Sequence, residues 1–154
     1  MAKIHVLLAL IAGYLLLANP VALAGVNEQT VYVIAGPSVE EKQLAREDVA
    51  LIFSRKRNFW SNGQRIQAVN LPPQHPLRQA LSQFLFGRAP EGMAEYWREM
   101  YFHGMLPPHV LESESAVALF VATVPGAIGY ISSCPSDGRL RVVFMVGAVE
   151  NCHR

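Results

Sequence analysis

Residues 51–85, LIFSRKRNFWSNGQRIQAVNLPPQHPLRQALSQFL, carry the pattern that decides the fold. The stretch predicts, in order, the end of a helix, a basic turn, a turn at Asn62-Gly63, a strand, a loop and a second helix. A loop that leaves a strand and opens a helix presents unpaired backbone N–H groups, which favour anions. The loop over residues 72–75 is therefore the first candidate binding site.

The second helix of this stretch has the strongest amphipathic pattern in the chain. Pro76 stands at the expected first helical position, where a missing N–H costs nothing. Apolar residues then recur at the spacing i, i+3, i+4, i+7 and i+8, namely Leu77, Ala80, Leu81, Phe84 and Leu85. We expect the preceding strand over residues 65–71.

The segments on either side alternate between strand and helix patterns. Residues 30–35 form a continuous apolar run, which predicts a strand covered on both faces, as in a parallel sheet between helices. Helices are expected over residues 44–53 and after the N-cap Ser113, and strands over 127–131 and 140–146. A helical stripe of Met93, Tyr96, Trp97, Met100 and Tyr101 is interpreted as core. The alternation predicts an α/β layered domain.

Residues 1–24 have the composition of a secretory signal peptide. Lys3 supplies a short positive region, residues 4–17 are mostly apolar, and residues 22–24 form a small-residue cleavage pattern. We expect cleavage after Ala24, which leaves residues 25–154 as the exported domain. An uncleaved membrane anchor is the alternative, but the apolar run is short for a span.

The exported part carries equal numbers of basic and acidic residues, because the 13 Lys and Arg against 12 Asp and Glu become equal without Lys3. This balance gives no indication of a nucleic-acid partner or of an anionic membrane surface. Cys134 and Cys152 either pair in an oxidising compartment or remain separate thiols. We favour the disulfide.

Four segments, in this order, resemble the phosphate-type periplasmic substrate-binding proteins of ABC importers. They are VIAGPS at 33–38, the helix that ends in Ile52-Phe53, WSNGQRI at 60–66 and PGAIGYI at 125–131. The resemblance implies a single lobe of a type 2 periplasmic-binding-protein-like fold, an α/β domain with a central, mostly parallel sheet flanked by helices. The family has two such lobes, and these segments match the second. The implied compartment is the periplasm.

The same resemblance implies a solute-binding module that binds phosphate or a related oxyanion weakly. The family's Ser-Gly-Thr element before the helix corresponds here to residues 74–78, which lack its hydroxyls. The implied ligand-binding residues are Gln74, His75, Leu77, Arg78 and Ser38. Arg78 keeps a positive charge in the first helical turn, where it can pair with an oxyanion. The alternative is that its side chain points to solvent.

The alternative function is a periplasmic accessory protein that kept the lobe fold without ligand transport. It would contact a membrane transporter or a sensor through a basic and aromatic surface. That surface consists of Arg55, Lys56, Arg57, Phe59 and Trp60.

The sequence does not indicate an enzyme, and we expect no cofactor and no metal. His75, His103 and His109 match no metal-ligand spacing, and no nucleophile or metalloprotease motif is present. Glu112 and Glu114 are explained by a helix N-terminus, where acidic side chains suit the dipole.

Overall fold

The computed structural model describes residues 29–147 and residue 152. The elements are β1 (Val31–Ala35), α2 (Arg46–Phe53), β2 (Gln67–Asn70), α3 (Pro76–Phe86), the 3₁₀ helix η1 (Pro90–Met93), α4 (Ala94–Phe102), β3 (His109–Val110), α5 (Glu114–Thr123), β4 (Ala127–Ile131) and β5 (Arg141–Val146). The strands and helices expected from the sequence are present, with bounds that differ by the usual one or two residues. The short strand β3 is an addition.

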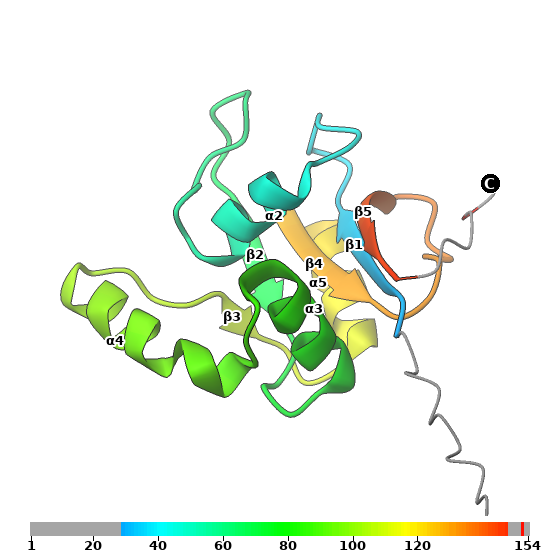
Figure 1. Cartoon of the computed structure of the whole chain (residues 1–154). Helices are drawn as coiled ribbons and strands as arrows, with labels where there is room; N and C mark the ends of the chain where they lie inside the picture. Colours follow the sequence, from blue (N-terminus) through cyan, green and yellow to red (C-terminus); the bar gives the residue numbers. More distant parts are fainter. Residues whose placement is uncertain (1–28, 148–151, 153–154) are drawn as a thin grey trace, which may run out of the picture.

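The strands of the described residues form one sheet in the order β3-β2-β4-β1-β5 (Figure 1). β2 runs parallel to β3 and β4, whereas β1 runs antiparallel to β4 and β5. The sheet is therefore mixed, and the expectation of a mostly parallel sheet holds only for its β3-β2-β4 half. The apolar run of β1 indicated burial, and burial on both faces does not determine strand direction.

Helices cover both faces of this sheet. α2 and α3 lie over one face and α5 over the other (Figure 1). All residues of β1 and β4 are buried, so these two strands form the centre of the core. Their burial from water is the main favourable term for the fold. The expected α/β layered domain is confirmed.

Gly129 in β4 allows α5 to approach the sheet closely. A Cβ atom at this position would lie 2.5 Å from Val117 Cγ1 and 3.0 Å from Val69 Cγ2. Both valines are buried, so neither has free space into which it can move. The glycine inside the expected strand therefore marks a close packing contact.

Trp60 anchors the segment between α2 and β2. Its side chain is 3% exposed, and its Nε1 donates a hydrogen bond to the Gly126 carbonyl at 3.0 Å. Trp60 is therefore not part of the exposed basic and aromatic surface that was expected at residues 55–60, and that prediction is wrong for this residue. An indole ring can be buried when its N–H has a hydrogen-bond acceptor. Phe59 remains 57% exposed.

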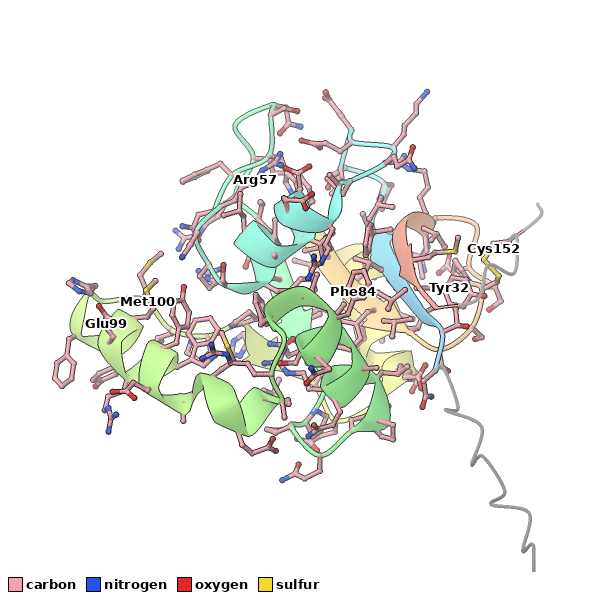
Figure 2. The ribbon with its side chains drawn as sticks, in the orientation of Figure 1. Tyr32, Arg57, Phe84, Glu99, Met100 and Cys152 are labelled. Atoms are coloured by element: carbon pink, nitrogen blue, oxygen red, sulfur yellow. A yellow bond between two sulfur atoms is a disulfide. The ribbon has the colours of Figure 1, made fainter. Side chains whose placement is uncertain are left out.

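The interpretation of the aromatic stripe as core is wrong for α4. None of the α4 residues is buried, and Tyr101 and Phe102 are 65% and 81% exposed. α4 extends from the side of the molecule away from β5, and Glu99 and Met100 lie on this projecting helix (Figure 1, Figure 2). An apolar stripe shows that a helix has one apolar face, but it does not show that a neighbour covers the face.

Cys134 and Cys152 form a disulfide, with their sulfur atoms 2.00 Å apart. The bond joins the segment after β5 to the loop that follows β4. Within the described part of the chain, no helix has the length and apolarity needed to cross a bilayer. The expected signal peptide over residues 1–24 lies outside the described residues.

Replacing Gly129 with alanine should lower the free energy of unfolding by about 1–3 kcal/mol, because the new methyl group overlaps two buried valines. Urea unfolding followed by tryptophan fluorescence measures the loss. Gly138→Ala is the matched control, since a Cβ atom there meets nothing within 4 Å. An equal loss in both variants would contradict the packing argument.

Candidate functional site

The C-terminal ends of β2 and β4 meet at one edge of the sheet, which we call the carboxyl edge. It consists of residues 70–78, residues 113–114 at the start of α5, and residues 130–132 at the end of β4. The parallel pairing of β2 with β4 places these segments together. Because α3 and α5 both begin there, their N-terminal N–H groups lie at the same edge. Ligands of open α/β sheets bind beyond the carboxyl ends of strands.

His75 caps the start of α3. Its Nδ1 accepts a hydrogen bond from the Leu77 N–H at 3.3 Å. An Nδ1 that accepts carries no proton, so the cap requires the imidazole tautomer protonated at Nε2. The Nε2 atom lies 4.0 Å from Glu114 Oε1 at the start of α5. His75 therefore connects the starts of the two helices.

Glu114 occupies hydrogen-bond donors at the end of β4. Its Oε2 accepts from the Ser132 N–H at 2.6 Å and from the Ser132 hydroxyl at 2.7 Å. A backbone N–H and a hydroxyl are donors that an oxyanion also uses. A hollow of about 190 Å³ lies beside this contact and is lined in part by Glu114, Ser115 and Ser133. An internal carboxylate thus takes the place that an external anion would take at Ser132.

Tyr130 forms the buried part of the carboxyl edge. Its hydroxyl accepts a hydrogen bond from the Leu71 N–H at 3.0 Å and donates one to Asn70 Oδ1 at 3.4 Å. Burial raises the pKa of Tyr130. The nearby positive charge of Arg78 and hydrogen bonds from the Leu71 N–H and the Arg78 side chain offset part of the rise. The hydroxyl therefore remains protonated at neutral pH, with the Arg78 guanidinium close to it.

Arg78 is half-buried beside Tyr130, so its side chain does not simply point to solvent. Its Nε atom is buried and has no hydrogen-bond partner in the described residues. Within the same residues, no carboxylate oxygen lies within 4.0 Å of its guanidinium. A partly desolvated cation without a counterion favours the binding of an anion.

The structure brings together four of the five residues expected to bind ligand. Two of them, Gln74 and His75, lie in the loop before α3. The other two, Leu77 and Arg78, lie in the first turn of this helix. Gln74 is exposed, whereas the side chain of Leu77 is fully buried. The Leu77 N–H is already bonded to His75. Arg78 supplies the guanidinium charge of this group, and its Nε has no hydrogen-bond partner among the described residues.

Ser38 lies at the opposite edge of the sheet from the other four residues. Its Oγ accepts a hydrogen bond from the Gly126 N–H at 2.8 Å, just before β4 begins. β1 runs antiparallel to β4, so the segment after β1 ends where β4 starts. Ser38 is thus separated from the carboxyl edge and serves the turn at Gly126.

Sequence reasoning missed three participants of the carboxyl edge, namely Glu114, Ser132 and Tyr130. Glu114 was explained as a dipole partner, and its hydrogen bonds to Ser132 come from another segment. Residues that follow neighbouring parallel strands meet at one edge of the sheet. The sequence alone does not show that β2 and β4 are such neighbours, so it does not place these three residues together.

No protein-family model matches the chain, and no curated protein matches it. Several solved structures are similar to this chain, among them the following three. One is assigned as a phosphate ABC transporter substrate-binding protein with bound phosphate, from Clostridium perfringens (TM-score 0.60, 18% identity, 73% of this chain and 43% of that chain). Another is an ABC-type phosphate transport receptor from Vibrio cholerae (TM-score 0.56, 17% identity, 73% and 44%). The third is a possible phosphate binding protein from Planctomyces limnophilus (TM-score 0.56, 12% identity, 75% and 42%).

At these identities the similarity shows the fold alone. The chain has the fold of one part of phosphate-type substrate-binding proteins, and it spans less than half the length of each of the three. This finding confirms the resemblance in fold to phosphate-type substrate-binding proteins and the size of a single lobe. The three proteins are named as binding proteins or receptors and not as enzymes.

Tyr130→Phe should lower the free energy of unfolding by about 1–3 kcal/mol, because the buried Leu71 N–H loses its acceptor. Chemical denaturation of both proteins measures the difference. Tyr101→Phe removes a hydroxyl from a side chain that is 65% exposed and serves as the control. A Tyr130→Phe protein as stable as the parent would show that the hydroxyl does not hold the end of β2.

Proposed function

We propose that this protein is an exported solute-binding module that binds phosphate or a related oxyanion at the carboxyl edge. The observation that carries the proposal is Arg78, a half-buried cation whose Nε has no partner and which has no carboxylate within 4.0 Å among the described residues. The starts of α3 and α5 add partial positive charge at the same edge. The names of the solved proteins with this fold support phosphate as the ligand.

Glu114 makes the expected affinity low. Its carboxylate already accepts both Ser132 donors, so an oxyanion meets a like charge and must displace it to use them. The edge is also open to solvent at Gln74. An anion bound there stays partly hydrated, which weakens its attraction to Arg78.

The same proposal includes export of the domain. Residues 1–24 would be a signal peptide cleaved after Ala24, and residues 25–154 the exported domain. The disulfide between Cys134 and Cys152 supports an oxidising compartment such as the periplasm. A membrane transporter or a sensor is the expected protein partner, and no catalysis is proposed.

Millimolar phosphate or sulfate should raise the midpoint of thermal unfolding of the mature protein, and Arg78→Ala should abolish the rise. Loss of a charge-assisted hydrogen bond costs about 1.5–3 kcal/mol, which corresponds to a roughly ten- to hundred-fold weaker complex. Thermal-shift measurements with chloride at equal ionic strength separate specific binding from screening.

Arg98→Ala is the matched control for Arg78→Ala, because Arg98 is exposed and pairs only with Glu95 on its own helix among the described residues. It should keep the full response to phosphate. No rise with either oxyanion in the parent protein would exclude the binding role and leave the accessory protein as the remaining function.

Glu114→Gln should strengthen oxyanion binding, because glutamine keeps an acceptor for Ser132 but removes the competing negative charge. The expected gain is about 1 kcal/mol, or roughly fivefold in affinity. Isothermal titration with phosphate measures it. Unchanged affinity in this variant would mean that the anion does not approach Ser132.

A further inference from the structure

The turn after α2 holds Arg55 in a conformation that arginine rarely adopts. Its φ is 62°, in the left-handed region. The Arg55 N–H donates to the Ile52 carbonyl at 3.0 Å and the Lys56 N–H to the Leu51 carbonyl at 2.8 Å. This is a Schellman motif, and its left-handed position is usually glycine. The helix end therefore gives no reason for an arginine at this place.

Arg55 carries a charge that the described residues do not compensate. Its Nε is buried without a hydrogen-bond partner. Burial lowers the pKa of Arg55, and the positive charge of Arg65 lowers this pKa further. In the described part of the chain, neither arginine has a carboxylate oxygen within 4.0 Å. Arg55 is half-buried and Arg65 is exposed, so an anion from solvent can reach this pair, which has no carboxylate within that distance among the described residues.

The other basic residues of this turn are already engaged. Arg57, labelled in Figure 2, makes ion pairs with Asp48 at 3.0 Å and Glu41 at 3.3 Å. The Lys56 Nζ lies 5.8 Å from the centre of the Tyr96 ring. Arg57 therefore joins parts of the fold, whereas Arg55 and Arg65 have no ion-pair partner in the part of the chain that the structure describes.

The backbone fixes Arg65 in the neighbourhood of Arg55. Arg65 and Phe59 form an antiparallel bridge. The Ile66 N–H donates to the Asn58 carbonyl at 2.9 Å, and the Asn58 side-chain amide donates to the Arg55 carbonyl at 3.0 Å. A ligand therefore meets two cations whose backbones are already ordered, which reduces the entropy cost of binding.

We propose that Arg55 and Arg65 form a second anion site, before β2 and away from the carboxyl edge, for a dianionic tetrahedral group such as phosphate, sulfate or the phosphoryl group of a monoester. Charge determines the class of ligand. A phosphoryl group carries about −1.5 to −2 at neutral pH and neutralises two guanidinium groups, whereas a carboxylate neutralises one. Guanidinium groups also match the oxygens of such anions geometrically.

The tetrahedral group can belong to a free inorganic anion or to a phosphorylated molecule, and the exposed ring of Phe59 offers a way to tell the two apart. Its ring is 57% exposed and is paired with Arg65 through the backbone. A monoester with an aromatic body can contact the ring, whereas an inorganic anion cannot. Phenyl phosphate should bind more tightly than inorganic phosphate if the source is a monoester, and Phe59→Ala should remove that difference. Equal binding of both assigns the site to the free anion.

The test is a titration of the full mature protein with inorganic phosphate, sulfate and phenyl phosphate, followed by amide chemical shifts. We expect the signals of residues 55–66 to move and Arg65→Gln to weaken this response roughly tenfold. Arg98→Gln, which removes an exposed arginine paired with Glu95, should change nothing. Arg78→Ala should leave the response of residues 55–66 intact, so this site and the carboxyl edge can fail separately.

Arg55→Gly provides a second variant that retains the fold, because glycine suits a φ of 62°. Without anion its thermal midpoint should stay equal or rise, and its anion response should vanish. A purely structural role for the arginine predicts the opposite change in midpoint. The proposal is overturned if residues 55–66 do not respond in the parent protein, or if Arg65→Gln and Arg55→Gly bind all three anions as the parent does.

Discussion

The pairing of β4 with β2 on one side and β1 on the other is the constraint on which the rest of the structure depends. The parallel partner brings Arg78 to the end of β4, where Tyr130 and Ser132 lie. The antiparallel partner sends Ser38 to the start of β4. This arrangement is possible because Gly129 lets α5 pack on the strand from one face. One strand therefore fixes where each group of polar side chains can act.

Most elements of the fold could be predicted because their signals are local. Pro76 begins α3, Ser113 caps α5, and Gly87 ends α3 in a left-handed conformation. The direction of β1 could not be predicted, because its uniform burial is compatible with either pairing. The exposure of α4 also escaped prediction, since it depends on which neighbour is present and not on the helix itself.

Only the part of the candidate site that is formed by residues adjacent in the sequence could be predicted. The loop before α3 and Arg78 follow directly from the strand-loop-helix pattern. The contact between Glu114 and Ser132 joins residues 18 positions apart, so it becomes visible only when the strand order is known. Trp60 illustrates the same limit, because its burial depends on an acceptor at Gly126, 66 positions along the chain.

The absence of buried side chains in α4 has a consequence for how the molecule opens. Little apolar surface has to be exposed to unfold this helix, so its local opening requires less free energy than global unfolding. Its amide hydrogens should exchange with solvent well before those of β1 and β4, whose residues are all buried. We therefore expect α4 to open locally, with loss of the hydrogen bond from the Tyr96 hydroxyl to the Ser54 carbonyl, while the sheet remains folded.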